Sequence, residues 1–230
     1  MKLKNVLVVY TIPRTRGQKS TLDKIIKILK KYAINFKLAN RDKLRNSQFL
    51  KKDLIIAVGG DGTFLRAAQF IEHQLILGIN TDPKNKEGFF MRHSRSNFEK
   101  KIIQILKSEF KVKKLSRLEA YINNKKIDPL ALNEFFIGAR KSYHAAKYNI
   151  QIGKKKERQK SSGILVTTPA GSYAWSKSCC NKTLPLNSKY YQFVVREPYE
   201  GRIFRNYKLK YGLLNKKQEV KIISEMLDGV

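Results

Sequence analysis

The sequence contains few of the residues that build disulfide frameworks and metal centres. Its 230 residues include 2 cysteines, the adjacent Cys179 and Cys180, and 3 histidines, which lie far apart. Adjacent cysteines exclude a disulfide framework in practice and indicate a reducing compartment. The histidines form no cluster with thiols or carboxylates at the spacing of a zinc site. We therefore expect no metal ion that protein side chains hold alone.

Long apolar runs are also missing, and no stretch of the sequence has transmembrane length. The apolar stretch at residues 6–12 is short, meets Pro13-Arg14 and is followed by no small-residue cleavage site. It therefore predicts a first strand and not a signal peptide. No transit peptide is evident, so we expect a cytoplasmic protein, or a mitochondrial one if the source is eukaryotic.

Acidic residues are scarce beside basic ones. Lysine and arginine number 48, aspartate and glutamate number 18, and the net charge is +30. Such an excess is typical of nucleic-acid-binding proteins. Here, however, the lysines are spread along nearly every segment, and the densest cluster, residues 154–156, has the setting of a hairpin tip. We interpret the charge mainly as solvated surface, with anionic small ligands and incidental RNA contact as the alternatives.

The most informative stretch is Gly-Gly-Asp-Gly-Thr at residues 59–63, called the glycine loop below. The apolar run at residues 54–58 predicts a strand buried on both faces of a parallel sheet, and apolar residues at helical spacing follow from Phe64 to Ile71. The loop is therefore expected at a strand-to-helix turn, where open α/β sheets bind ligands. Its glycines let backbone N–H groups approach phosphate oxygens, and the helix N-terminus adds positive potential.

Asp61 is the unexpected member of the glycine loop, because a phosphate repels a carboxylate. It could hold a Mg²⁺ or take a proton from an attacking hydroxyl. The alternative is an ordinary glycine-rich turn in which Asp61 caps the helix. The strand before the loop and the helix after it favour the phosphate site.

The first half of the chain predicts a doubly wound α/β domain with a mostly parallel sheet at residues 1–111. Because strand ends at one edge of such a sheet share a crevice, Asn80, Thr81 and Asp82 should lie near Asp61. The nearby Phe89 and Phe90 are either core residues or an aromatic wall beside a base. Strands are expected at residues 6–10, 34–38, 54–58 and 75–79, and helices behind a capping-box pattern at residues 20–23, after the glycine loop and at residues 97–110.

From about residue 112 the pattern changes to short alternating runs. It predicts an antiparallel β-domain over residues 112–230, packed against the first domain with the ligand between the two. Asn123-Asn124 indicates a hairpin turn, and residues 203–209 and 220–223 are among the expected strands.

Two polar clusters interrupt this second domain. Asn133-Glu134 lies between apolar runs and is costly to bury unless it binds a ligand; the alternative is a satisfied turn. Residues 167–176 read Thr-Thr-Pro-Ala-Gly-Ser-Tyr-Ala-Trp-Ser. They form either a ligand loop whose aromatic residues pack on a ring or an ordinary loop with its aromatic residues in the core.

Together these stretches resemble the NAD kinase family. The glycine loop alone also occurs in diacylglycerol and sphingosine kinases, and the Asn-Glu pair and the Thr-Pro-x-Gly-Ser block narrow the resemblance to NAD kinases. Residues 78–83, 159–163 and 174–176 are most similar to the mitochondrial-type branch. The matching stretches follow the family's order over most of the chain and are the glycine loop, Asn80-Thr81, Gly88-Phe89, Asn133-Glu134, residues 163–175 and Asp228-Gly229.

The resemblance implies an N-terminal α/β domain, an all-β sandwich-like C-terminal domain, and a homodimer or homotetramer. It implies transfer of a phosphoryl group from ATP or polyphosphate, with Mg²⁺ or another divalent cation, to the 2′-hydroxyl of the adenosine ribose of NAD⁺, giving NADP⁺. Asp61 matches the general base, and Gly59, Gly60, Gly62 and Thr63 match the phosphate loop. The implied NAD-binding residues are Asn80, Phe89, Asn133, Glu134, Ser162, Thr168, Tyr173, Ala174, Trp175 and Ser178.

The chain also departs from the family pattern. Many members carry an aspartate where Ser162 stands, at the nicotinamide riboside end of the site. The family's Thr-Ala-Tyr reads Tyr173-Ala174-Trp175 here, so that packing replaces a tyrosine hydroxyl contact. The sequence stops at Val230, where family members usually continue with another strand. Two other functions stay open, namely a lipid kinase of the diacylglycerol or sphingosine type and an inactive, basic, nucleic-acid-binding relative.

Overall fold

The computed structural model describes residues 3–227, and it divides the chain into two compact units, unit 1 at residues 1–112 and unit 2 at residues 113–230. Each unit is described by itself. Asp228 and Gly229, which contribute to the family resemblance, lie outside the described residues. Within residues 3–227, no helix has the length and apolar character needed to cross a membrane.

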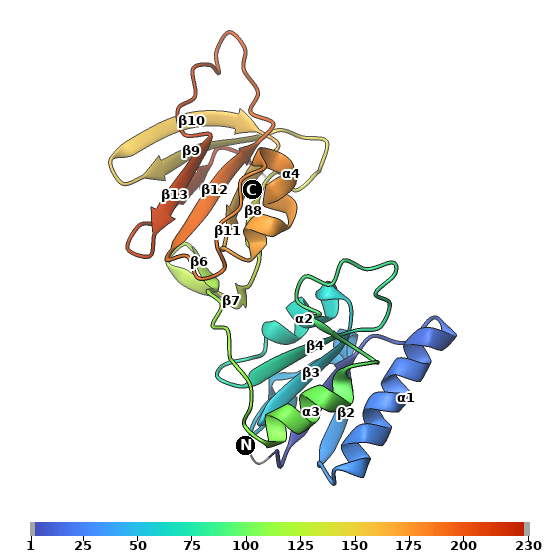
Figure 1. The fold of residues 1–230 in the computed structure, drawn as a ribbon. Coiled ribbons are helices and arrows are strands. Elements are labelled where there is room, and N and C mark those ends of the chain that lie inside the picture. The colour runs from blue at the N-terminus through green and yellow to red at the C-terminus, as the bar shows by residue number, and fades with distance from the viewer. Residues whose placement is uncertain (1–2, 228–230) are drawn as a thin grey trace. The chain divides into compact units, whose positions relative to one another are not determined.

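Unit 1 contains a five-stranded sheet in the order β2-β1-β3-β4-β5, in which every neighbouring pair is parallel (Figure 1). All six residues of β3 are buried, as expected for a central strand covered on both faces. The chain moves outward in opposite directions from β1 and β3, so the sheet has its switch point between these two strands. The strands are β1 (Val6–Tyr10), β2 (Phe36–Asn40), β3 (Leu54–Gly59), β4 (Leu75–Asn80) and β5 (His93–Ser94).

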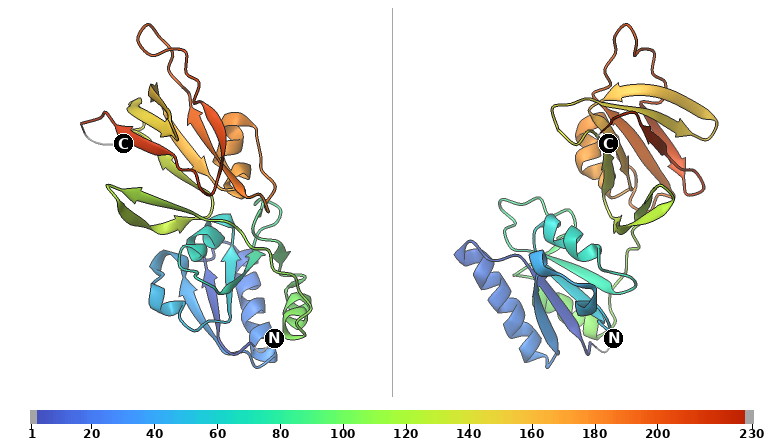
Figure 2. Two further views of the ribbon diagram at one scale, coloured as in Figure 1. Left: turned by 90° about the vertical axis from the view of Figure 1, so that its left-hand side faces the viewer. Right: turned by 180° about the vertical axis from the view of Figure 1, so that it is seen from behind.

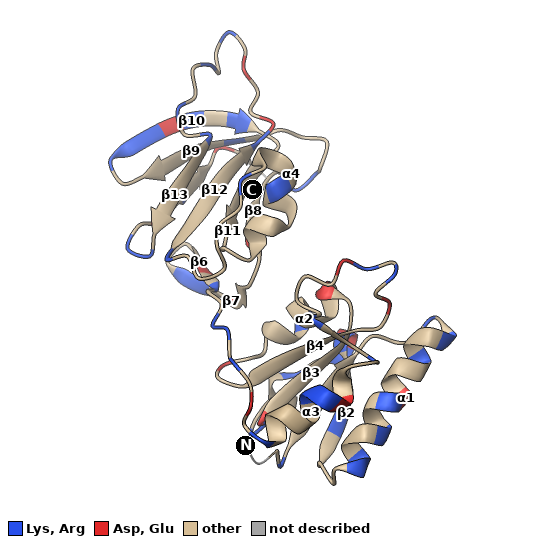
Figure 3. Cartoon of the chain, viewed as in Figure 1, with Lys and Arg blue, Asp and Glu red and all other residues tan. Residues whose placement is uncertain are grey.

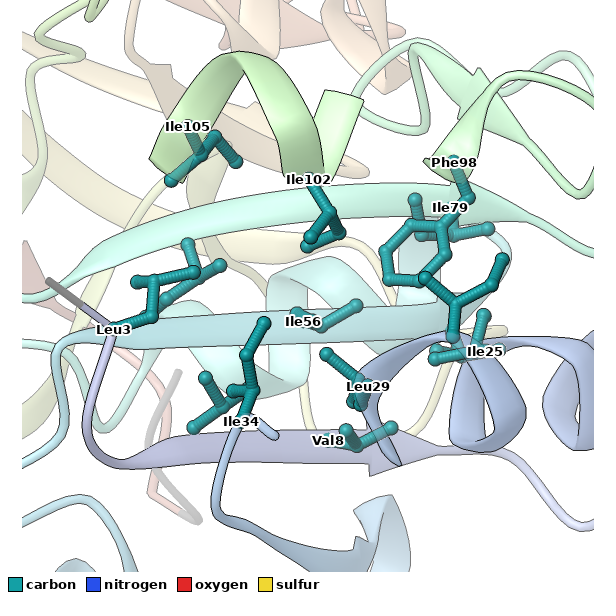
Figure 4. Packing of buried hydrophobic residues seen from close by; sticks show 14 residues of the cluster. Leu3, Val8, Ile25, Leu29, Ile34, Ile56, Ile79, Phe98, Ile102 and Ile105 are labelled. Atoms are coloured by element: carbon teal, nitrogen blue, oxygen red, sulfur yellow. The ribbon is translucent and has the colours of Figure 1, made fainter. Parts of the chain in front are cut away.

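Helices cover both faces of this sheet. One buried cluster joins alternate residues of β1 and β3, such as Val8 and Ile56, to α1 and α3, and Figure 4 shows this packing. A second cluster joins the opposite face to Ala67 of α2. The prediction of a doubly wound α/β domain is therefore confirmed. The helices are α1 (Arg16–Lys31), α2 (Asp61–Ala68) and α3 (Phe98–Leu106), with the 3₁₀ turns η1 (Arg41–Lys43) and η2 (Asn46–Gln48).

The capping box expected at residues 20–23 is wrong, because α1 begins earlier. Thr15 is the N-cap, and its Oγ1 accepts a hydrogen bond from the backbone N–H of Gln18 at 3.3 Å. Thr21 lies inside the helix, where its hydroxyl donates to the carbonyl oxygen of Gly17 at 2.9 Å. A threonine can satisfy its hydroxyl within a helix in this way, so the sequence pattern did not mark the start of α1.

Unit 2 is a β-sandwich with an additional hairpin, and the prediction of an all-β domain is confirmed. A three-stranded sheet, β10-β9-β14, packs against a four-stranded sheet, β13-β12-β11-β8, through a core that includes Ile150, Ile164 and Phe193. The strands are β6 (Leu118–Ile122), β7 (Lys125–Ala131), β8 (Glu134–Ile137), β9 (Ala146–Ile152), β10 (Lys155–Ser161), β11 (Gly163–Thr167), β12 (Tyr190–Arg196), β13 (Tyr211–Asn215) and β14 (Lys221–Ser224).

Turns and loops of unit 2 both confirm and correct the sequence-based expectations. Asn123 and Asn124 have positive φ angles and connect β6 to β7, as the turn pattern predicts. The strand expected at residues 203–209 is wrong, because this segment is an irregular loop before β13. Its backbone N–H groups at Lys208 and Leu209 donate to the Glu157 carboxylate at 2.9 and 3.0 Å, so a side chain takes the place of a neighbouring strand.

A short helix covers the outer face of the four-stranded sheet. The helix α4 (Trp175–Cys180) follows the 3₁₀ turn η3 (Gly171–Tyr173), and its contacts are with β12 (Figures 1 and 2). The buried Gln192 side chain of β12 donates through Nε2 to Ser176 Oγ at 2.8 Å, which ties α4 to the sheet.

Lysine and arginine residues are distributed over helices, strands and loops of both units, as Figure 3 shows. This distribution agrees with the interpretation of the charge as solvated surface. The same abundance makes it hard to select functional cations from the sequence alone.

Candidate functional site

The glycine loop lies at the switch point of the unit 1 sheet, at the carboxyl end of β3. Thr63 is fully buried, and its Oγ1 lies 2.6 Å from Oγ1 of Thr11, which follows β1. A Cβ atom added to Gly59 would lie 2.4 Å from Thr63 Oγ1. Only glycine fits there, so the backbone approaches the end of β1 closely. Open sheets bind ligands in the crevice at such a switch point.

The carboxylate of Asp61 is held by a segment 28 residues further along the chain. Its Oδ2 accepts a hydrogen bond from the backbone N–H of Phe89 at 2.9 Å, and its Oδ1 accepts one from Phe90 at 2.7 Å. The N-cap of α2 is Gly60, so the alternative that Asp61 caps this helix is wrong. Each oxygen keeps a second lone pair. The half-buried carboxylate is therefore fixed in direction and still able to accept a proton.

Asn80 supports the same region from the end of β4. Its buried side chain donates through Nδ2 to the carbonyl oxygen of Lys86 at 3.1 Å and accepts from the N–H of Asp82 at 2.9 Å. Gly88 has a φ of +69°, and an added Cβ would lie 2.5 Å from Asn80 Nδ2. The two ends of the Asn80 side chain thus shape the turn that carries Phe89 to Asp61.

Two phenylalanines follow this turn and have different environments. Phe90 stacks on the buried Phe64 of α2, with ring centroids 4.9 Å apart and an interplanar angle of 8°. Phe89 meets Phe90 edge to face at 4.9 Å and is half-buried, and the Arg92 guanidinium lies 5.4 Å from its ring centroid. Both phenylalanines are half-buried, and Phe90 packs on α2 while Phe89 packs on Phe90 and Arg92.

Two basic side chains flank the glycine loop and were not singled out from the sequence. An added Cβ at Gly60 would lie 3.2 Å from Cδ of Lys86, and one at Gly62 would lie 3.4 Å from Nη1 of Arg41. Both side chains are half-buried. Among 48 lysines and arginines no pattern marks these two, because they reach the loop from the 82–86 turn and from η1.

Asn133 directly precedes β8 in unit 2, and Glu134 is the first residue of this strand. Asn133 Oδ1 and Glu134 Oε2 are buried without a hydrogen-bond partner among the described residues. Burial raises the pKa of the Glu134 carboxyl above its ordinary value. Buried acceptors without partners are costly, so the pair is not the satisfied turn that the sequence left open. Groups that donate hydrogen bonds would complete both side chains.

The loop after β11 is built around the backbone of Asn133. The Asn133 carbonyl oxygen accepts from Thr168 N at 2.8 Å and from Thr167 Oγ1 at 3.2 Å. Thr168 Oγ1 donates to Leu132 O at 2.6 Å and accepts from Gly171 N at 2.9 Å. An added Cβ at Gly171 would lie 2.2 Å from the Asn133 carbonyl oxygen. Thr168 therefore supports the pair from beneath, and its hydroxyl keeps one acceptor lone pair.

The exposed aromatic residues of this loop lie beside β8 and β12. The Trp175 ring lies 5.0 Å from the Phe136 ring, and the Arg196 guanidinium lies 4.5 Å from the Trp175 centroid. Ser162 donates its backbone N–H to the Arg196 carbonyl oxygen at 3.0 Å, so it lies at this end of the sheet and not beside Asn133. Ser178 Oγ donates to the Trp175 carbonyl oxygen at 2.7 Å within α4, while Tyr173 and Ala174 are exposed.

The structure thus gathers the predicted residues into two groups. Unit 1 brings Asp61, Asn80 and Phe89 together around the glycine loop. Unit 2 brings Asn133 and Glu134 together with Thr168, and places the 173–175 segment over the same sheet. The first group presents backbone N–H groups, cations and one carboxylate, which suits phosphate chemistry. The second presents unpartnered acceptors and aromatic rings, which suits a nucleoside.

Comparison with known proteins finds relatives of this chain among NAD and NADH kinases. Residues 6–110 match the family described as the ATP-NAD kinase N-terminal domain. A probable NADH kinase of rice (Oryza sativa subsp. japonica) is 27% identical over 236 residues, which cover 93% of this chain and 72% of the rice protein. An NAD kinase of Acinetobacter baylyi is 35% identical over 132 residues, covering 55% of this chain and 42% of that protein. Human mitochondrial NAD kinase 2 is 27% identical over 246 residues, which cover 80% of this chain and 55% of the human protein.

Solved structures show the same fold over nearly the whole chain. The crystal structure of an NAD kinase from Archaeoglobus fulgidus in complex with ATP has a TM-score of 0.76 at 22% identity and covers 96% of this chain and 81% of that chain. The crystal structure of yeast NADH kinase complexed with NADH has a TM-score of 0.79 at 19% identity. The match covers 96% of this chain and 68% of the yeast chain. Among the relatives compared by sequence, this chain spans 72% of the length of the rice protein, 42% of the Acinetobacter baylyi protein and 55% of the human protein.

Proposed function

The chain belongs to the NAD kinase family, and we propose that it transfers the terminal phosphoryl group of ATP to the 2′-hydroxyl of the adenosine ribose of NAD, giving NADP. The observation that carries the proposal is the carboxylate of Asp61. It lies in the glycine loop at the switch point of the sheet and is oriented by the N–H groups of Phe89 and Phe90. Phosphoryl transfer requires alignment and charge neutralisation more than covalent help from the protein.

The donor phosphates bind at the glycine loop. Backbone N–H groups at the start of a helix and the positive end of its dipole attract phosphate oxygens, and the glycine loop leads into the start of α2. Lys86 and Arg41 flank the loop and neutralise further negative charge. Among residues 3–227 no group of three His, Cys, Asp or Glu side chains could hold a metal ion. Mg²⁺ therefore fits this site as an ion carried by the donor phosphates, where it would supply charge neutralisation.

Asp61 accepts the proton of the ribose hydroxyl as the oxygen attacks phosphorus. The hydrogen bonds from Phe89 and Phe90 occupy one lone pair on each carboxylate oxygen and leave one for the substrate. They also prevent the carboxylate from turning away. A base fixed in this way saves the entropy of orientation at the moment of reaction.

NAD binds through the acceptors of unit 2. Asn133 Oδ1 and Glu134 Oε2 are buried and unpartnered, and NAD carries ribose hydroxyls and an exocyclic amine that donate hydrogen bonds. The remaining NAD-binding residues come from the 173–175 segment, from Phe89 and from Ser162 and Ser178. In this proposal both groups of residues take part in one reaction, in which the acceptor hydroxyl loses its proton to Asp61.

The proposal is tested by assaying the purified protein with a panel of substrates. NAD⁺ and NADH are each offered with Mg²⁺ and either ATP or polyphosphate, and the products are separated by mass. We expect a phosphorylated dinucleotide from at least one pair. Diacylglycerol and sphingosine serve as competing acceptors, and lipid phosphorylation without NADP or NADPH would contradict the proposal. Salt-sensitive RNA binding with no transfer to any acceptor would contradict it as well.

We also infer from the family resemblance an assembly of two or four copies in the cytoplasm, or in the mitochondrion of a eukaryotic source. Light scattering coupled to size-exclusion chromatography measures the mass in solution. A mass equal to one 26.7 kDa chain at assay concentrations, in a fully active sample, would contradict the assembly.

A further inference from the structure

The outer face of the four-stranded sheet carries a line of residues that the proposed reaction has not used. Strand register places Thr167 beside both Glu134 and Gln192, and Gly163 beside Arg196. Side chains two residues apart share a face of a strand. Glu134 and Phe136 of β8 therefore lie on the same face as Gln192 and Arg196 of β12. This is the face that α4 covers, because Gln192 is hydrogen-bonded to Ser176.

Arg196 occupies the far end of this face. Its guanidinium lies 4.5 Å from the Trp175 ring centroid and 5.7 Å from that of Phe136. Its side chain is 20% exposed, and its hydrogen bond runs from Nη2 to Oε1 of Glu197 at 3.2 Å. A guanidinium carries five N–H donors, so most of the donor capacity of Arg196 is unused. The partner Glu197 is itself 63% exposed, and such a surface pair contributes little.

The three buried side-chain polar atoms that lack a partner among the described residues are Asn133 Oδ1, Glu134 Oε2 and Arg196 Nε. Glu134 and Arg196 lie on the same face of the four-stranded sheet, and Asn133 directly precedes Glu134. Arg196 is four residues beyond Gln192, which stands level with Glu134 in the register, so the two ends are separated by about 13 Å along the strands. Two acceptors at one end, aromatic rings at the side and a donor at the other end match an elongated ligand that has hydroxyls and an anionic group.

We propose that Arg196 binds the pyrophosphate of the dinucleotide, with its guanidinium stacked on Trp175 and Phe136. The proposal rests on the proposed function, since it names a further contact of the same ligand. Planar guanidinium donors pair with two phosphate oxygens at once, and stacking on aromatic rings keeps the fork oriented before the ligand arrives. The dinucleotide runs across the outer face of the sheet from Glu134 of β8 to Arg196 of β12, and Glu197 gives up its hydrogen bond when the phosphates bind.

The test compares ligands that differ in the pyrophosphate. Affinities of NAD⁺, NADH, ADP-ribose and adenosine are measured by calorimetry for the full chain and for Arg196→Met. Methionine keeps an apolar stem and a sulfur contact with the rings, so that the substitution removes mainly the charge. We expect NAD⁺, NADH and ADP-ribose to bind about 10- to 100-fold more weakly, and adenosine to bind as before.

Arg158→Met is the matched control. Arg158 also lies over an aromatic ring, 5.0 Å from the Phe204 centroid, and pairs with Glu225 at 2.8 Å, but it belongs to β10 of the other sheet. The Arg158→Met substitution should leave the affinities for NAD⁺, NADH, ADP-ribose and adenosine unchanged.

Two results would overturn the proposal. Equal losses for adenosine and ADP-ribose would make Arg196 only a positioning residue for Trp175, and unchanged affinities for all ligands would remove it from the site. Trp175 is the one tryptophan of the chain, so its fluorescence reports whether Arg196→Met has moved the ring. Failure of the wild-type chain to bind NAD⁺ and NADH would instead contradict the proposed function itself.

Discussion

The two groups of candidate residues differ in how completely their polar atoms are satisfied. In unit 1, both oxygens of Asp61 and both polar atoms of the Asn80 side chain have hydrogen-bond partners. In unit 2, Asn133 Oδ1 and Glu134 Oε2 are buried and have none among the described residues. The proposed chemistry site is therefore preorganised by the protein, whereas the proposed nucleoside site has acceptors that a ligand would complete.

This difference has consequences for mutations. A change in unit 1 breaks contacts that already exist, so it disturbs the position of reacting groups. A change in the unpartnered atoms of unit 2 removes no contact of the free protein, so it alters binding while leaving the fold intact. The predictions below follow from this contrast and run from the largest expected effect to the smallest.

Asp61→Asn should have the largest effect. It removes the proton acceptor, and general bases contribute about 10²- to 10⁴-fold to rate. An asparagine side chain also offers only one acceptor oxygen, so one of the N–H groups of Phe89 and Phe90 loses its partner. We therefore expect turnover to fall about 10²- to 10⁴-fold or more, with a smaller loss of NAD affinity through Phe89. Steady-state kinetics with separate binding measurements give the two effects, and near-normal turnover would refute the assignment of the base.

Gly171→Ala tests the support beneath the unit 2 pair. The new Cβ would lie 2.2 Å from the Asn133 carbonyl oxygen and 2.4 Å from Thr167 Oγ1, so the backbone of Asn133 must move. Overpacking of this kind costs about 1–3 kcal/mol of stability, and NAD affinity should fall with it. Thermal unfolding and calorimetry measure the two quantities.

Gly17→Ala is the control for this substitution. Gly17 lies in α1 with its nearest side-chain neighbour at 3.9 Å, so alanine fits and should stabilise the helix by up to about 1 kcal/mol. Equal effects of the two substitutions would show that Gly171 does not fix the position of Asn133.

Glu134 should make NAD binding depend on pH. Burial raises its pKa, so in the free protein the neutral form persists to higher pH than in an exposed glutamate, and the stability that this form contributes is lost as pH rises through the raised pKa. Ligand hydroxyls that donate to the carboxylate favour the charged form instead. NAD binding should therefore release protons near the raised pKa and strengthen as pH rises through it. Calorimetry in buffers of different ionisation enthalpy counts the protons, and Glu134→Gln should abolish the release.

Lys86→Ala should have the smallest effect, because Lys86 neutralises donor charge without orienting a reacting atom. We expect KM for ATP to rise about 2- to 5-fold while KM for NAD stays constant, as for a partly exposed charge contact. Lys84→Ala is the control, since Lys84 is exposed in the same turn. A similar rise in both variants would indicate a general effect of net charge and not a contact at the glycine loop.

Much of the fold could be predicted from the sequence because local patterns determine it. The apolar run at Leu54 and the helical spacing after Gly62 defined β3 and α2, and the glycine loop fell between them. Alternation and the Asn123-Asn124 turn identified the β-rich second half. The patterns failed where tertiary contacts replace local ones. Residues 203–209 look like a strand, but Glu157 takes up their N–H groups.

The candidate site was predictable in its residue types and not in its contacts. The polar pair Asn133-Glu134 stood out because it interrupts an apolar segment. By contrast, the hydrogen bonds of Asp61 to Phe89 and Phe90 connect residues 28 and 29 positions apart, and no periodicity reports them. Arg41, Lys86 and Arg196 were lost among 48 basic residues, since only their positions in the fold distinguish them from solvated lysines and arginines.

The most direct test of the account is the position of the new phosphate in the dinucleotide product. The wild-type protein is incubated with NAD⁺ or NADH, ATP and Mg²⁺, and ³¹P NMR of the purified product locates the added group. The account predicts a monophosphate ester on the 2′-oxygen of the adenosine ribose, formed by the wild-type chain and lost in Asp61→Asn. A phosphate at another hydroxyl, or equal product from Asp61→Asn, would contradict it.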